Sequence, residues 1–372
     1  MSMSVSQSTV VDEPMRKNRG MKARIEWIDI AKGMGIVLVS FGHLRNGDGQ
    51  SVWLPALDVL VSAIYLFHMP LFYFLGGLTF GRRGGFKAFL IRKIKTLLVP
   101  YYIFSLYFLA KPIAILLIPS MRATFQTNHN YDLAHQFVDV LVMGNGLWFL
   151  MAFFVAEIMM YGLVSITKNN HAILTVVSVA LILISFAVNG FIGKLPIPFQ
   201  LWKGVEITGF MALGYVLREW LKSLEQHRLT AYIVICFIFF CFLAWCTFSK
   251  SVSLTLDCLV RLLSAITGIF CCIFLAIEIK QCGILAYIGK ASLVFYSLNA
   301  LTLNISKLVV FRLLHLNVAS CDFAIQFCIG LVVTGLSLLI LFFENLFVQK
   351  YMPWSIGRSK AHRSRRVLGA EK

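Results

Sequence analysis

The segment "KGMGIVLVSFGH", from Lys32 to His43, begins the first long apolar run of the chain and carries an ionisable residue at each end. An ionisable side chain inside a membrane span costs free energy, so its presence there is by default an indication of function. Eleven residues of α-helix advance about 16 Å and turn about three times, which places Lys32 and His43 on one face. Asp29 lies near the same face, and Gly33 and Gly35 would let a neighbouring helix or a slender ligand approach closely.

The composition of the whole chain agrees with a membrane location. Apolar residues make up 59% of the 372 residues, charged residues only 14%, and the mean hydropathy is +0.79. These values exclude a soluble domain of this size. The net charge of +17 does not indicate nucleic acid, because the basic residues fall in short segments between apolar runs, as juxtamembrane charges do. The sequence therefore predicts an all-α polytopic membrane protein with membrane lipid around it and no nucleic-acid partner.

Apolar runs long enough to cross a bilayer, about 20 residues each, predict about ten transmembrane helices. They lie near residues 27–46, 62–80, 96–118, 147–166, 171–190, 204–220, 230–249, 254–279, 284–305 and 321–348. Placing both termini in the cytoplasm assigns 24 Lys and Arg residues to inner segments and eight to outer ones, as the positive-inside rule requires. We expect a basic cytoplasmic tail over 1–24, a transmembrane domain over 25–349 and a second basic cytoplasmic tail over 350–372.

Two further stretches carry candidate functional residues. His68, in "FHMPLFYFLGG", is predicted at the same depth as His43, where the two could form a catalytic centre, a proton relay or merely an interfacial pair. Arg92 and Lys95, in "RKIKTLLVPYY", are spaced i,i+3 and could hold a phosphate, although basic residues at a cytoplasmic boundary need no function. Glu157 lies in the middle of the fourth predicted span without an opposite charge on its own helix, which makes it another candidate.

Other kinds of site have no sequence support. The nine cysteines form no CxxC pair and have no metal-ligand spacing with histidine, and no nucleotide-binding, GxSxG or HExxH motif is present. We therefore expect no metal site and no tightly bound cofactor.

The chain resembles the integral-membrane acyltransferase 3 family, and most closely its fucose 4-O-acetylase-like branch. The stretches that carry this resemblance are "IEWIDIAKGMGIVLVSFGH", "FHMPLFYFLGG", "RKIKTLLVPYY", "GLWFLMAFFVAE" and "YIGKASLVFYSLN", in this order over about residues 25–300. The family signature of a basic residue, ten intervening residues and a histidine matches Lys32 to His43, with lysine in place of the commoner arginine. Asn299, the "FLGG" stretch and Thr96 depart from the usual family pattern.

The resemblance implies a bacterial inner-membrane O-acetyltransferase with acetyl-CoA as co-substrate. Its acceptor would be a hydroxyl of a surface polysaccharide or of its lipid-linked precursor, such as O-antigen of lipopolysaccharide or an exopolysaccharide. His43 would carry the central proton-transfer role, with His68 and Glu157 as further catalytic candidates. Lys32, Arg92 and Lys95 would meet the phosphates of the donor, with Asp29 in support.

The chemistry leaves several alternatives open. His43 could act as a general base or could accept the acetyl group itself. Trp148, Tyr296 or Asn299 could supply a hydrogen-bond donor to the developing oxyanion. A proton-coupled transporter or flippase is the main rival function, because paired histidines and intramembrane charges also suit a carrier.

Overall fold

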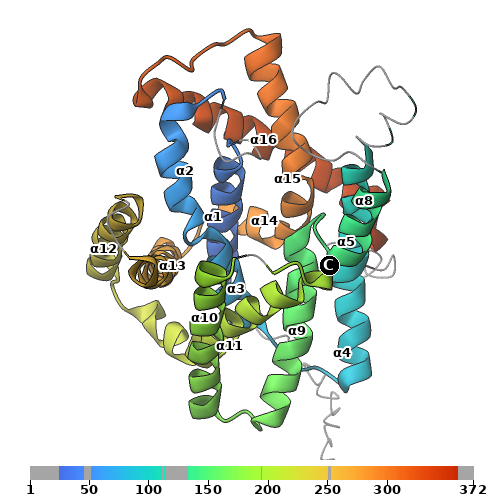
Figure 1. Cartoon of the computed structure of the whole chain (residues 1–372), viewed down its shortest axis with the longest axis vertical. Helices are drawn as coiled ribbons and strands as arrows, with labels where there is room; N and C mark the ends of the chain where they lie inside the picture. Colours follow the sequence, from blue (N-terminus) through green and yellow to red (C-terminus); the bar gives the residue numbers. More distant parts are fainter. Residues whose placement is uncertain are drawn as a thin grey trace, which may run out of the picture.

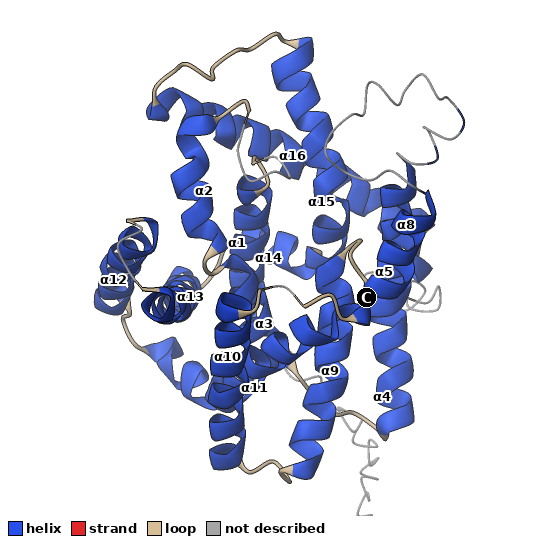
Figure 2. Ribbon diagram, in the orientation of Figure 1, coloured by secondary structure: helices blue, strands red, loops and turns tan. Residues whose placement is uncertain are grey.

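The computed structural model describes residues 25–45, 52–110, 113, 117, 133–193, 195–249 and 253–358. Every regular element in these ranges is helical (Figure 2). The predicted tail 1–24, most of the predicted tail 350–372 and part of the predicted span 96–118 lie outside the described residues.

The main helices of the described residues succeed one another along the chain, as expected for a polytopic protein. In chain order they are α1 (Glu26–Gly42), α2 (Asp58–Tyr65), α3 (His68–Thr79), α4 (Phe86–Lys93), α5 (Val99–Ser105), α8 (Leu133–Val138), α9 (Trp148–Ile166), α10 (His171–Phe191), α11 (Leu201–Ser223), α12 (Thr230–Phe248), α13 (Leu254–Ile279), α14 (Gly283–Lys290), α15 (Ser292–Lys307) and α16 (Phe323–Tyr351). Wider π-helical turns occur at Ile94–Leu98, Asp139–Met143 and Leu308–Leu313.

Seven helical segments among the described residues are long and apolar enough to cross a membrane. They are Pro55–Thr79, Leu133–Ile166, His171–Phe191, Thr230–Phe248, Leu254–Ile279, Ser292–Leu313 and Phe323–Tyr351. The predicted count of about ten is therefore not confirmed. Of the remaining predicted spans, α1 has only 17 residues and contains Glu26, Asp29 and Lys32, and α11 carries five charged residues.

Helix α1 lies in the centre of the bundle, which explains how it accommodates its charges. It packs against α3, α13, α14, α15 and α16 (Figure 1), and its middle residues are mostly buried. Helices α12 and α13 pack together at one edge of the molecule. Asp29 and Ser40 of α1 are therefore surrounded by protein, where partners can satisfy them, whereas Lys32 is half-buried and Glu26 is exposed.

Two helix crossings bring backbones into direct contact at glycines. A Cβ atom at Gly33 of α1 would lie 2.1 Å from the Leu285 oxygen of α14, and one at Gly289 would lie 1.9 Å from the Asp29 oxygen. Gly77 of α3 and Gly214 of α11 meet the opposite backbone in the same way. Small residues permit this close approach in membrane helices. Gly33 thus admits a neighbouring helix, and the ring of Phe72 fills the space over Gly35.

The predicted span 284–305 is broken in the structure. Helix α14 ends at Lys290 and α15 begins at Ser292, so that only the second segment, continued to Leu313, is long enough to span. The tight contact of Gly289 with α1 holds α14 as a short separate helix against the centre of the bundle.

Candidate active site

His43 follows the last residue of α1, and its ring is fixed by the preceding helical turn. The Nδ1 atom lies 2.8 Å from the carbonyl oxygen of Val39. A carbonyl oxygen only accepts hydrogen bonds, so Nδ1 carries the proton of the neutral ring and Nε2 keeps a lone pair. His43 therefore presents a proton-accepting nitrogen away from its own helix.

His68 is fixed in the same way at the start of α3. Its side chain is 1% exposed, and Nδ1 lies 2.9 Å from the carbonyl oxygen of Ile64. The ring of Tyr65 contacts both histidines, with its centroid 6.2 Å from that of His43 and 4.8 Å from that of His68. The structure thus brings the two predicted histidines into one aromatic cluster.

Both histidines line a cavity of about 960 Å³, which we call the histidine cavity. Its walls come from the end of α1, the start of α3, the start of α9, the end of α10, and the starts of α11 and α13. Trp148 and Tyr296, two of the predicted oxyanion donors, also line it. Ligand sites are concave and carry a few convergent polar groups, as this cavity does.

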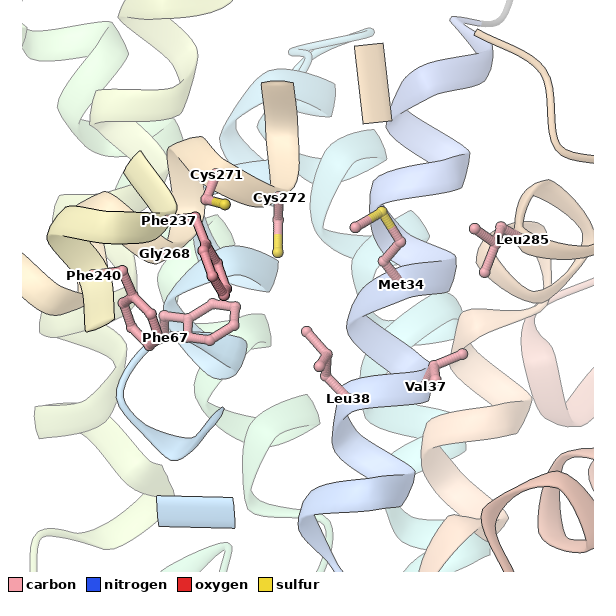
Figure 3. A pocket seen from close by; sticks show the side chains of 10 residues that line it. All are labelled: Met34, Val37, Leu38, Phe67, Phe237, Phe240, Gly268, Cys271, Cys272 and Leu285. Carbon is pink, nitrogen blue, oxygen red and sulfur yellow. The ribbon is translucent and has the colours of Figure 1, made fainter. Parts of the chain in front are cut away.

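A smaller cavity of about 350 Å³ lies on another side of α1 and differs in chemistry. Figure 3 shows Met34 and Leu38 of α1 facing Phe67, Phe237 and Phe240 across it. Its remaining lining residues are Val37, Gly268, Cys271, Cys272 and Leu285. Apart from the two cysteine thiols, the described residues of this lining are apolar and carry no carboxyl, imidazole or charged group, so proton-transfer chemistry is assigned to the histidine cavity.

The third predicted oxyanion donor, Asn299, has a different position. Its Oδ1 atom accepts a 2.6 Å hydrogen bond from Ser40 Oγ, and both side chains are buried. Asn299 is not among the described residues that line the histidine cavity. It ties α15 to the last turn of α1, one turn before His43.

The start of α9, which carries Trp148, is held from α5. The Ser105 hydroxyl accepts a 3.1 Å hydrogen bond from the backbone N–H of Leu147, and the Tyr101 hydroxyl donates to the carbonyl oxygen of Val140. The Trp148 ring lies 5.8 Å from Lys203 Nζ, within the range of a cation–π contact.

Glu157 lies with basic residues from other elements and is 3% exposed. Lys93 Nζ donates a short hydrogen bond to Glu157 Oε1, and Arg92 and Lys32 also act on this carboxylate electrostatically. We call Lys32, Arg92, Lys93 and Glu157 the basic cluster. Glu157 is not among the described residues that line the histidine cavity. It therefore lies in a different site from His43 and His68.

The predicted pair of Arg92 and Lys95 does not form a two-residue clamp of its own. A π-helical turn begins at Ile94 and widens the helix between them. Arg92 donates a 3.2 Å hydrogen bond to the Arg83 oxygen, whereas Lys95 is exposed. Asp29, the supporting residue, is buried on α1 with its backbone oxygen against Gly289.

Comparison with known protein families decides the assignment of the chain. A family model for the acyltransferase 3 domain, described as an acyltransferase domain, matches residues 25–342. The chain belongs to the acyltransferase 3 family. Comparisons with curated proteins and with solved structures gave no significant match.

Membership of the acyltransferase 3 family, together with the seven membrane-capable helices, indicates a multi-pass membrane acyltransferase. The matched region contains the basic cluster and the whole histidine cavity. The fucose 4-O-acetylase-like branch is not confirmed by this match.

Two residues of this acyltransferase were missed by the sequence reasoning. Lys93 was counted only as a positive-inside charge, yet it is the partner that Glu157 lacks on its own helix. Lys307 was counted only as an outer charge, yet it is 8% exposed and its Nζ donates a 2.7 Å hydrogen bond to the His43 carbonyl oxygen. The sequence offered one indication that Lys307 has a structural or functional role, namely its position within an apolar run.

The charges of the cavity wall on α11 and α13 occur as pairs. Arg261 Nε donates a 2.7 Å hydrogen bond to Asp257 Oδ2, and the two residues, four apart on α13, neutralise each other. Glu206 is 6% exposed and pairs with Lys203 Nζ at 2.8 Å. Burial of a carboxylate requires such a partner.

Proposed function

We propose that the protein is a membrane O-acetyltransferase. It would move an acetyl group from acetyl-CoA to a hydroxyl of a cell-surface polysaccharide or of its lipid-linked sugar precursor, such as O-antigen or exopolysaccharide. The location would be the cytoplasmic membrane of a bacterium. One observation carries the proposal. His43 lines the histidine cavity, and the hydrogen bond of its Nδ1 to the Val39 oxygen leaves Nε2 as the nitrogen that can accept a proton.

The proposed chemistry needs one base and one developing oxyanion. His43 Nε2 would take the proton of the acceptor hydroxyl as its oxygen attacks the thioester carbonyl carbon. A C–O bond forms, the C–S bond breaks, and the thiolate of CoA leaves and takes up a proton. Trp148 or Tyr296, which line the cavity, could donate to the carbonyl oxygen during the attack.

An alternative route passes through the same residue. His43 Nε2 could attack the thioester first and hold the acetyl group as acetyl-histidine until the acceptor arrives. His68 would then orient or relay through the aromatic cluster that it shares with Tyr65 and His43. Both routes use the same cavity and the same lone pair.

The donor would enter from the other end of α1. The basic cluster there supplies Lys32, Arg92 and Lys93, and Lys95 is exposed nearby in sequence. Cationic side chains bind phosphate groups through charge-assisted hydrogen bonds, which suits the nucleotide part of CoA. About 16 Å of helix rise separates Lys32 from His43, so a long, slender donor is required to connect them.

The helix directions support one arrangement of the sites. If both termini are cytoplasmic and about ten segments span the membrane, the end of α1 and the starts of α3, α9, α11 and α13 all face outward. These are the elements that form the histidine cavity. The proposed topology therefore places acceptor chemistry outside and the basic cluster toward the cytoplasm.

The deciding experiment measures acetyl transfer directly. Purified protein with labelled acetyl-CoA should release CoA and pass the label to polysaccharide from a deletion strain. Mass spectrometry of that polysaccharide should show one acetyl group less per repeat, restored by complementation. An unchanged polysaccharide combined with uptake of a solute by the protein in vesicles would favour the transporter alternative.

A further inference from the structure

One wall of the histidine cavity contains a chain of hydrogen-bonded side chains that the proposed chemistry does not use. Trp202 Nε1 donates a 3.0 Å hydrogen bond to Asn189 Oδ1, and Asn189 Nδ2 donates a 3.1 Å bond to Glu206 Oε2. Lys203 Nζ donates a 2.8 Å bond to the same oxygen. These four residues all line the cavity and join the end of α10 to the start of α11.

The start of α13 completes this wall with Asp257 and Arg261, which also line the cavity. Glu206 and Asp257 each accept hydrogen bonds from described residues through one carboxylate oxygen, Oε2 of Glu206 and Oδ2 of Asp257. Each carboxylate has capacity for about four acceptor contacts, and the Asn189 amide has a second N–H. The wall therefore retains donors and acceptors in fixed positions for hydroxyl groups.

Aromatic surface lies beside these polar groups. The indole rings of Trp148 and Trp202 both line the cavity, and Trp202 is oriented by its hydrogen bond to Asn189. A pyranose ring has the matching character, with an apolar C–H face and a rim of hydroxyls, and aromatic side chains offer large apolar faces next to a polar edge.

The charge balance of the cavity restricts the kind of sugar. Among the described residues, four Lys, Arg, Asp and Glu side chains line the cavity. They form two ion pairs, Lys203 with Glu206 and Asp257 with Arg261. Each cation already has a carboxylate partner within 2.8 Å. A uronic acid or sugar phosphate would bring a further negative charge without a spare cation to meet it, at a cost in a partly buried site.

The geometry points to a subsite for an uncharged pyranose ring on this wall, formed by Trp202, Asn189 and Glu206 with the start of α13. The inference rests on the proposed function, because it assigns this wall to the acetyl acceptor. The sugar hydroxyl to be acetylated would face His43 across the cavity, while the other hydroxyls bind the wall.

The test compares the binding of two soluble probes, a methyl hexopyranoside and the corresponding methyl hexuronide, to the full-length protein in detergent. Saturation-transfer NMR measures this binding without turnover, so it is independent of acetyl transfer. The wild-type protein should bind the hexoside about tenfold more tightly than the uronide, the scale of one unfavourable buried charge contact.

The informative variant is Glu206→Gln, because it keeps the shape of the side chain and leaves Lys203 without its counter-charge. The ratio of uronide to hexoside affinity should rise about tenfold, and a ratio does not depend on how much protein is folded. The matched control is Glu219→Gln on the same helix. Glu219 is exposed, its carboxylate lies 2.8 Å from Lys222 Nζ, and neither residue lines the cavity as far as the chain is described. The control should leave the ratio unchanged.

A second variant tests the hydrogen-bonded chain without changing charge. Trp202→Phe keeps an aromatic ring but removes the N–H that orients Asn189, and hexoside affinity should fall about fivefold, the effect of one lost hydrogen bond. Trp245→Phe, at a position 67% exposed on α12, is its control. Equal binding of the two probes by the wild type, absence of hexoside binding, or an unchanged ratio in Glu206→Gln would overturn the assignment. Failure of acetyl-CoA turnover would instead overturn the proposed function.

Discussion

Lys307 Nζ donates a 2.7 Å hydrogen bond to the carbonyl oxygen of His43, and a second carbonyl oxygen, that of Arg45, lies 3.4 Å away. The last carbonyl groups of a helix lack intrahelical partners, and a cation near them is favourable. Lys307 at the end of α15 therefore holds the end of α1 and the backbone of its histidine.

We predict that Lys307→Met lowers kcat for acetyl transfer about tenfold while the KM for acetyl-CoA stays constant. The bond is charge-assisted and buried, a class that contributes about 1.5–3 kcal/mol, and its loss frees the end of α1. Steady-state kinetics with labelled donor measure both constants. Lys290→Met, at an exposed position at the end of α14, is the control and should behave as the wild type. A rise in donor KM with constant kcat would contradict a role in positioning His43.

His43→Ala should abolish acetyl transfer, since loss of a general base costs about 10²–10⁴-fold in rate. Donor binding and the amount of protein in the membrane should stay near normal. His68→Ala should be milder, because His68 is proposed to orient or relay and not to take the proton of the acceptor hydroxyl itself. Full transfer by His43→Ala would remove this residue from the proposed chemistry, and acetyl-CoA binding measured by calorimetry distinguishes loss of chemistry from loss of the donor site.

Removing a positive charge from the proposed donor site should affect donor binding, whereas His43→Ala should affect the rate of transfer. Lys32→Gln, Arg92→Gln and Lys95→Gln are each predicted to weaken acetyl-CoA binding by about 1–3 kcal/mol, the scale of a charge-assisted hydrogen bond. Donor KM should rise more than kcat falls. Lys222→Gln, which removes a charge from an exposed pair, serves as the comparison. Unchanged donor affinity in any one variant would exclude that residue from the donor site.

Gly289→Ala should destabilise the protein by about 1–3 kcal/mol, the usual cost of overpacking. The added Cβ would lie 1.9 Å from the Asp29 backbone oxygen, and neither helix can yield without moving the other. Gly162→Ala, within α9 and with open space around it, should instead be neutral or stabilising by up to about 1 kcal/mol. Thermal unfolding in detergent compares the two, and equal midpoints would contradict the direct backbone contact.

The proposed topology gives a prediction that needs no activity. Reporter fusions near residues 88, 225 and 365 should all read cytoplasmic, and a fusion near 128 should read external. A cytoplasmic reading at 128 would break the model of about ten spans, in which α1 and α11 cross although each is shorter or more polar than the seven segments found here.

The sequence predicted the parts of this site that lie on single helices. Lys32 and His43 could be placed on one face of α1 because helical geometry is regular over eleven residues. The i,i+4 ion pair of Asp257 and Arg261 follows from the same regularity. Contacts between helices could not be derived, because hydrophobic periodicity identifies a buried face without naming what covers it. Lys93 with Glu157, Lys307 with His43 and Trp202 with Asn189 are all of this second kind.

The sequence pattern also did not predict local irregularities within helices, such as π-helical turns. The π-helical turn from Ile94 to Leu98 changes the direction of side chains after Lys93, so the i,i+3 spacing of Arg92 and Lys95 no longer predicts a shared face. Gly289 marks the break at Ala291 in the sequence, because glycine weakens a helix, but the close contact of Gly289 with Asp29 of α1 is visible only in the structure.

The glycine crossings also determine which motions the molecule can make. At Gly33 with Leu285, and at Gly77 with Met211, backbone touches backbone, and a slide by one helical turn of about 5.4 Å would bring a side chain into a space that accepts none. The Gly33 contact therefore opposes a lengthwise shift of α1 past α14, and the Gly77 contact opposes one of α3 past α11. We therefore expect α1 to stay in register with α14 during a reaction cycle, so that Lys32 and His43 remain about 16 Å apart along the helix.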